Sequence, residues 1–310
     1  MQKIPELLDE VHGLIEETRA RFLLTGSSAR KLKRGGANLL AGRAATRRLH
    51  PLTVQEIGAD FDLERALRLG TLPSVVAGDE PAAEELLAAY AETYLREEIQ
   101  AEGVVRNVGG FARFLDVAAA RSGEILNASA VARDAGVSGR TVLVYFEILE
   151  DTRIGFRLEP WRKSPRARLV GHPKSYFFDT GVTNALTRRL HARIDPTLRG
   201  LLLEQWLVTE CMRLLDYRFP ETQLYYWRTN HGAEVDLIFE RHGKLRLAAE
   251  IKSGRTVSSA DLSGLRSFGE AHPRVPRAVV ATVPEAFRID DVEVLPLLRF
   301  LAELERWLDA

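Results

Sequence analysis

The sequence has a single cysteine, Cys211, among its 310 residues. This excludes an intramolecular disulfide and is typical of a protein in the reducing cytosol. No apolar run is long enough to cross a bilayer, and residues 1–5 lack the basic and then apolar layout of a signal peptide. We therefore expect a soluble cytoplasmic protein that does not contact a membrane.

An excess of charge of either sign is also missing. Lysine and arginine total 43, and aspartate and glutamate total 43. Overall electrostatics therefore does not indicate nucleic-acid binding, and any basic surface has to be local. The hydrophobic content of 45% and the charged content of 28% are ordinary for a globular protein, and a chain of this length suits two or three domains.

The first 60 residues predict one amphipathic helix and one strand. Residues 4–19 place their apolar side chains on one helical face. Phe22–Leu24 form a short apolar run that ends in small polar residues. A buried strand that ends in this way is common in α/β sheets, where ligands lie beyond the carboxyl ends of the strands.

This segment resembles the C-terminal half of an AAA-type ATPase domain, on the strings QKIPELL, RFLLTGSSARKLKRGG, NLLAGR and HPLTVQEI. It is similar to a prokaryotic family in which that module precedes a C-terminal domain of unknown function. The resemblance implies a nucleotide-sensing strand with Thr25 and Ser27, and a candidate arginine finger, Arg43. Since such a finger acts on a neighbouring subunit, a homo-oligomer or an ATPase-competent partner is expected.

The parts of such a domain that hold the nucleotide are missing. In the family, a P-loop, G-x-x-x-x-G-K-[ST], and an acidic Walker B strand precede this segment, but the sequence contains no Gly-Lys-Ser or Gly-Lys-Thr. We expect no ATP cofactor and no ATP hydrolysis by the chain alone. Two explanations stay open: an ATP-binding protein whose start codon is assigned too late, or a gene that has lost its motor. Reading the DNA upstream of Met1 would distinguish them.

The middle of the chain predicts a helical lid or connector over residues 61–105 and a winged helix over 106–165. Ala132, Gly136 and Val142 have the spacing of a helix-turn-helix, with Ser138 as the cap of its second helix. Asn127 or Ser129 would cap the first of these helices. The string IGFRLEPW, residues 154–161, is interpreted as a wing hairpin.

DNA is a candidate partner of this region. Arg140 and Thr141 would be exposed near the start of the second helix, and WRKSPRARL forms a local basic patch with Arg162, Lys163, Arg166 and Arg168. The alternative is a protein–protein module or spacer, because the second helix carries one arginine followed by two glutamates, which is unfavourable for phosphate attraction.

Residues 166–310 predict a three-layer α/β/α domain. A long helix precedes the strands EVDLIFE and LRLAAEIKSG, which His242-Gly243 would join as a hairpin, and helix, strand and helix follow. Side chains alternate across a strand, so Glu250 and Lys252 project from one face, and Asp236 lies on the paired strand. Two carboxylates that converge from adjacent strands suit Mg²⁺, and a nearby lysine can orient a water and offset phosphate charge.

This pattern resembles the PD-(D/E)XK nuclease superfamily, which has a restriction-endonuclease-like fold. Asp236 matches the first acid, and Glu250 and Lys252 match the second motif. Glu204 lies on the preceding helix, where resolvase-like members carry a further metal-binding glutamate. The resemblance implies catalysis by Asp236, Glu250 and Lys252 with Mg²⁺ held by Glu204, Asp236 and Glu250. Val235 replaces the usual proline before the first acid.

Besides an ATP-binding protein whose start codon is assigned too late, two functions remain open from the sequence. The first is a DNA-associated protein of the AAA-type family with a Mg²⁺-dependent nuclease-like domain. The second is a non-catalytic module that binds DNA or protein, because a nuclease-like core can be kept for binding or assembly. Overall the sequence predicts a multidomain α/β protein with a partial AAA-type segment, a helical lid, a winged helix and a restriction-endonuclease-like domain.

Overall fold

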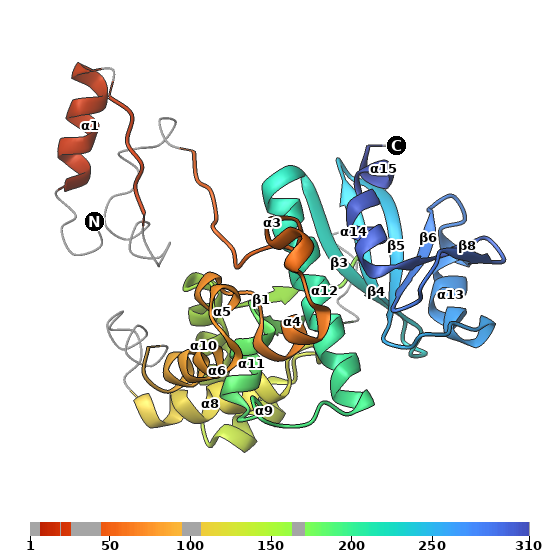
Figure 1. Cartoon of the computed structure of the whole chain (residues 1–310), viewed down its shortest axis with the longest axis horizontal. Helices are drawn as coiled ribbons and strands as arrows, with labels where there is room; N and C mark the ends of the chain where they lie inside the picture. Colours follow the sequence, from red (N-terminus) through yellow and green to blue (C-terminus); the bar gives the residue numbers. More distant parts are fainter. Residues whose placement is uncertain (1–6, 19, 26–44, 95–106, 163–170, 310) are drawn as a thin grey trace.

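The computed structural model describes residues 7–18, 20–25, 45–94, 107–162 and 171–309 (Figure 1). In the N-terminal segment, α1 spans Leu7–Glu17. The strand predicted over Phe22–Leu24 is wrong: residues 20–25 carry no strand, and the Leu23 side chain is 91% exposed. A strand needs a neighbour for its backbone hydrogen bonds, and none pairs with this run among the described residues.

A series of short helices follows, and those between Leu63 and Tyr94 lie in the segment predicted as the helical connector. Acidic or hydroxyl side chains fix their starts: Thr53 caps α3, Asp62 caps α4 and Asp79 caps α6, each by accepting a backbone N–H three residues ahead. The elements are α3 (Val54–Ile57), the 3₁₀ turn η2 (Gly58–Asp60), α4 (Leu63–Leu69), α5 (Pro73–Ala77), α6 (Glu80–Ala89) and the π-helical turn η3 (Tyr90–Tyr94).

Three longer helices come next: α8 (Val108–Ala120), α9 (Ala128–Ala135) and α10 (Gly139–Asp151). Asn127 caps α9 and Ser138 caps α10, while Gly136 ends α9 in the left-handed conformation at φ 65°. The predicted caps and turn are therefore present. These helices share one apolar core with α5, α6 and α11 (Thr180–Leu186), and we call this body the helical unit.

The strand pairing next to α10 differs from the prediction. IGFRLEPW contains one strand, β1 (Gly155–Leu158), and no hairpin. Its antiparallel partner is β2 (Lys174–Phe177). The predicted boundary at residues 165/166 therefore separates two strands that pair, and α11 beyond it packs in the helical core. Local sequence cannot reveal this, because the partner of a strand is chosen by long-range packing.

The C-terminal part, which we call the sheet unit, confirms a mixed α/β class. Its described strands form a six-stranded sheet in the order β3-β4-β5-β6-β8-β7. β3, β4 and β5 are antiparallel, and β5, β6 and β8 are parallel. The strands are β3 (Thr222–Arg228), β4 (Glu234–Arg241), β5 (Lys244–Lys252), β6 (Arg277–Ala281), β7 (Phe287–Ile289) and β8 (Val292–Pro296).

The β4–β5 turn is where the sequence places it. His242 and Gly243 both have positive φ, at 53° and 71°. This pair of left-handed residues matches the twist of a two-residue hairpin. Helices cover both faces of the sheet: α12 (Pro196–Arg218), α14 (Leu297–Glu303) and α15 (Glu305–Leu308) on one, and η4 (Ser259–Leu262) with α13 (Ser263–Ala271) on the other.

The long helix α12 joins the two units, and in Figure 1 it runs between them. Its side chains contribute to the sheet core with α14 and α15. In the other direction, Gln205 donates to the Phe177 carbonyl and Arg213 donates to the Phe178 carbonyl. The last residue of β2 and the residue after it are thus bound to α12. Among the described helices, none combines the length and the apolar character that crossing a bilayer requires.

Candidate functional site

Two carboxylates meet where β4 and β5 pair. Leu237 of β4 lies opposite Ala249 of β5, which places Asp236 and Glu250 one step further along the same ladder. Asp236 Oδ2 accepts the backbone N–H of Ile251 at 2.8 Å, which fixes its orientation. The side chains of Asp236 and Glu250 are only 14% and 13% exposed.

Lys252 lies beside Glu250, as strand alternation predicts. Its Nζ is 2.9 Å from Glu250 Oε1, while Ile251 between them is buried in the core shared with α12. Glu250 Oε2 is different: it is buried, and among the described residues it has no hydrogen-bond partner. The sequence-predicted trio of Asp236, Glu250 and Lys252 is therefore brought together in space.

A second lysine, Lys174, occupies the centre of the acidic side chains. Its Nζ lies 2.8 Å from Glu204 Oε1, 2.6 Å from Glu234 Oε1 and 3.7 Å from Asp236 Oδ1. The Lys174 side chain is 6% exposed. A buried ammonium is stable only if it is closely paired, and these carboxylates supply that pairing. We call Glu204, Glu234, Asp236, Glu250, Lys174 and Lys252 the junction cluster.

Glu204 reaches the cluster from α12. Its Oε1 accepts the hydroxyl of Tyr176 at 2.8 Å as well as the Lys174 ammonium. Lys174 and Tyr176 are two residues apart on β2, so they point to the same side. The site is thus built from three elements: β2 of the helical unit, α12, and the β4–β5 pair of the sheet unit.

The burial and close spacing of these charged side chains shift the pKa values of Asp236, Glu250 and Lys174. Burial raises the pKa of Asp236 to about 8, and the nearby Glu204 and Glu250 carboxylates add to the increase while Lys174 opposes it. Burial also raises the pKa of Glu250, against the effect of Lys252. For Lys174, burial alone would lower the pKa, but Glu204, Asp236 and Glu234 outweigh it and hold the pKa above its ordinary value.

The fit to a metal ion is mixed. Carboxylate oxygens are the ligands that Mg²⁺ prefers, and the unpartnered Glu250 Oε2 is a free buried acceptor. In the described residues, however, no group of three or more acidic, histidine or cysteine side chains is arranged to hold a metal ion. The ammonium of Lys174 separates Glu204, Glu234 and Asp236. The donor types fit a hard cation, provided that Lys174 leaves its position.

The other predicted residues do not join this cluster. Thr25 is exposed in a non-strand segment, and Ser27 and Arg43 lie outside the described residues. Arg140 is exposed in the first turn of α10, while the Thr141 hydroxyl lies 2.7 Å from Ser138 Oγ. Arg162 is half-buried, and the remaining residues of the basic patch are not described: Lys163, Arg166 and Arg168.

Sequence reasoning missed Lys174 and Tyr176. One signal was present: KSYFF carries a lysine at the start of an otherwise apolar run, and a lysine in a buried strand requires a partner. The partner itself could not be named, because Glu204 and Glu234 lie far away in sequence. Glu234 also pairs with Arg228, at 3.1 Å.

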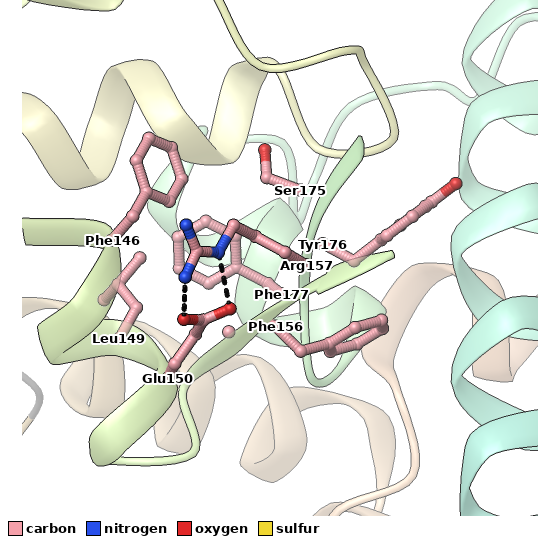
Figure 2. Close-up of a pocket in the computed structure, with 9 residues that line it drawn as sticks. Phe146, Leu149, Glu150, Phe156, Arg157, Ser175, Tyr176 and Phe177 are labelled. Atoms are coloured by element: carbon pink, nitrogen blue, oxygen red, sulfur yellow. Dashed lines mark hydrogen bonds and ion pairs between the residues drawn. The ribbon is translucent and has the colours of Figure 1, made fainter. Parts of the chain in front are cut away.

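Residues of β2 also line a small pocket with α10 and β1 (Figure 2). Arg157 Nε and Nη2 bind Glu150 Oε1 and Oε2 at 2.7 and 2.5 Å. Tyr176 points away from this ion pair, toward α12, as Figure 2 shows. Arg157 and Glu150 neutralise each other, so this pocket is a weaker candidate for a binding or catalytic site than the junction cluster.

Three family models match the chain. An AAA domain matches residues 1–58, a domain of unknown function (DUF8612) matches residues 60–193, and a second domain of unknown function (DUF4143) matches residues 199–300. The boundary between the last two falls at the start of α12, which agrees with the division into helical and sheet units. These matches support a relation to an AAA-type family with additional domains of unknown function.

The similar proteins are themselves uncharacterised. One from Mycobacterium tuberculosis is 29% identical over 248 residues, which cover 78% of this chain and 55% of that protein. One from Haemophilus influenzae is 23% identical over 207 residues, which cover 58% of this chain and 52% of that protein. The chain therefore spans about half the length of the curated relatives it matches. No solved structure matches it.

Proposed function

We propose that this chain, related to an AAA-type ATPase family, acts on DNA and that its sheet unit is a Mg²⁺-dependent phosphodiesterase of the PD-(D/E)XK type. The carrying observation is the convergence of Asp236 and Glu250 from paired strands, with Lys252 Nζ 2.9 Å from Glu250. The order of α12, antiparallel β3-β4-β5, α13 and parallel β6 supports the same superfamily.

Each residue has a role that its position suggests. Asp236, Glu250 and Glu204 would hold the cation, and the buried, unpartnered Glu250 Oε2 is the oxygen best suited to gain a ligand. When bound, Mg²⁺ supplies a Lewis acid for the phosphate and lowers the pKa of a bound water. Lys252, oriented by Glu250, can hold the attacking water or offset charge on the phosphate.

The helical unit supports DNA as the partner. Its elements run α8, α9, α10, β1, β2, and Ile125 between α8 and α9 makes an isolated bridge to Lys174 of β2. This is the order of the helices and strands in a winged helix, with β1 and β2 as its antiparallel strand pair. Arg140 is exposed at the start of α10. In a helix-turn-helix, the N-terminal residues of the recognition helix contact the base edges.

No nucleotide site is part of this proposal. The segment matched by the AAA domain model, residues 1–58, contains no Gly-Lys-Ser or Gly-Lys-Thr. Since the P-loop lysine and backbone hold the phosphates in such domains, we propose that ATP binding would require residues other than those of this chain.

A second candidate function rests on Lys174. Its ammonium already compensates Glu204, Glu234 and Asp236, so the cluster can be stable as a metal-free ionic network. The sheet unit would then be a non-catalytic module that binds DNA or protein, and the cluster would hold the two units together.

A cleavage assay separates the two functions. Wild type, Asp236→Asn and Glu250→Gln are incubated with Mg²⁺ or Mn²⁺ and with linear, supercoiled, branched and single-stranded DNA and with RNA. Catalysis by the cluster predicts that either substitution lowers the cleavage rate by roughly 100-fold or more. Glu293→Gln, an acidic residue of β8 paired with Arg288 and Arg306, serves as the matched control and should cleave as wild type does.

Equal cleavage by wild type and Asp236→Asn would identify a contaminating nuclease and end the phosphodiesterase proposal. Absence of metal-dependent cleavage on every substrate would favour the non-catalytic module.

A further inference from the structure

Lys174 belongs to the helical unit, and its partners belong to α12 and to the sheet unit. It begins β2, which pairs with β1 and, through Ile125, with the segment between α8 and α9. Backbone bonds fix the same strand to the helical unit: Gly123 donates to the Ser175 carbonyl at 2.8 Å, and Leu126 donates to the Pro173 carbonyl at 2.8 Å. The lysine is therefore held by the helical unit.

The carboxylates around the Lys174 ammonium come from elements other than the helical unit. Glu234 and Asp236 are on β4, and Glu204 is on α12. The three Nζ–oxygen distances run from 2.6 to 3.7 Å, and the Tyr226 ring of β3 lies 5.6 Å from Nζ. This is the environment of a bound cation: several oxygens and one aromatic face, almost out of contact with water.

The Lys174 ammonium occupies the space that the proposed metal ligands surround. Glu204 and Asp236 would both have to bind the metal, and both now face the Lys174 ammonium. An ammonium and a divalent cation cannot share this space, since like charges a few ångströms apart repel strongly at low dielectric. A metal therefore has to displace the lysine.

We infer that Lys174 is an internal counter-cation, supplied by the helical unit, that competes with a divalent cation for Glu204 and Asp236. This inference rests on the proposed metal site and adds that Lys174 controls metal binding there. The apparent metal affinity is set by the fraction of molecules in which the lysine is withdrawn.

Mn²⁺ binding measured by calorimetry and by electron paramagnetic resonance tests the inference without any need for catalysis. Lys174→Met removes the ammonium and keeps the length of the side chain. If the lysine-withdrawn state is a tenth of the population or less, the Mn²⁺ Kd should fall by roughly tenfold or more in this variant. Arg228→Met is the matched control, because it removes one positive charge bordering Glu234 without emptying the place of Lys174.

A second variant guards against misfolding, because Lys174→Met alone leaves buried carboxylates without their partner. Lys174→Met combined with Glu234→Gln removes one charge of each sign and empties the same place. It should also bind Mn²⁺ more tightly than wild type. Unchanged or weaker Mn²⁺ binding in both variants overturns the inference, and so does an equal gain in Arg228→Met, which would indicate a general charge effect.

The two proposals can fail separately. Variants that bind Mn²⁺ no better than wild type while all cleave DNA would overturn the inference and leave the phosphodiesterase in place. Variants that gain Mn²⁺ affinity without any cleavage would support the competition and remove catalysis.

Discussion

The guanidinium of Arg213 lies 3.8 Å from the Asp179 carboxylate, and the two side chains are 3% and 1% exposed. Arg213 also donates to Thr71 Oγ1 and to the Phe178 carbonyl. Asp179 caps α11 through the Val182 N–H and accepts the Thr71 N–H. One ion pair thus joins α11 and the end of α4 to α12, and it is a structural centre rather than a catalytic one.

Asp179→Ala is expected to destabilise the protein strongly. It removes a helix cap and takes one of the two carboxylates that the described residues place beside the buried Arg213, which keeps only Glu210 at 3.5 Å. Breaking a buried ion pair typically costs about 3–5 kcal/mol. Asp195→Ala removes the exposed cap of α12, where Asp195 accepts the Leu198 N–H, and should cost only about 1 kcal/mol. Urea unfolding of both variants checks this. Similar losses in the two would show that the Arg213–Asp179 pair contributes no more than a surface cap.

The stability of the metal-free protein should depend on pH through Asp236. Its pKa is raised from 3.8 to about 8, mainly by burial. Between these values the folded protein holds a proton that the unfolded chain has released. Stability from this group is therefore greatest at low pH and falls as pH rises toward 8. Asp236→Asn cannot titrate, so the unfolding free energy of wild type minus that of the variant should decrease from pH 5 to pH 8 in EDTA.

Asp134 gives a control of opposite sign. Its pKa is lowered, first by the hydrogen bond from Arg121. Its contribution is therefore present above the ordinary pKa of an aspartate and is lost only as pH falls below it. The difference between wild type and Asp134→Asn should stay flat over the range in which Asp236→Asn changes. Parallel slopes for the two variants would contradict the assignment to Asp236.

Gly264 allows α13 to approach the junction cluster. A Cβ there would lie 1.9 Å from the Glu234 carbonyl and 3.1 Å from Glu250 Oε2. Gly264→Ala should therefore push α13 away from β4 and destabilise the protein by about 1–3 kcal/mol. Gly139→Ala is the control, since nothing lies within 4 Å of its Cβ at the start of α10, and it should be neutral or stabilising by up to about 1 kcal/mol. Chemical denaturation compares them, and equal effects would contradict the close packing of α13.

DNA binding through α10 can be tested by removing Arg140. Arg140→Ala should weaken binding to duplex DNA and reduce the slope of log K against log salt by about 1. Arg299→Ala on α14, whose side chain pairs with Glu303, removes the same charge on the sheet unit. Fluorescence anisotropy at several salt concentrations measures both variants. An equal loss in both would indicate an effect of net charge only.

The sequence by itself determined the local features of the site. Strand alternation places Glu250 and Lys252 on one face and Ile251 in the core, and the pair His242-Gly243 predicts the turn that brings Asp236 alongside. The caps Asn127 and Ser138 were predictable in the same way. Each of these depends on residues close in sequence, and their conformational preferences act over a few bonds.

Only the tertiary structure decided what fills the centre of the site. It paired β1 with β2, overturned the predicted wing hairpin and the boundary at 165/166, and placed Lys174 among Glu204, Glu234 and Asp236. It also left Phe22–Leu24 without a strand partner among the described residues. These outcomes depend on which surfaces are buried together and on which charges must then be compensated. Such a choice is made by packing and desolvation over the whole chain, and no short pattern carries it.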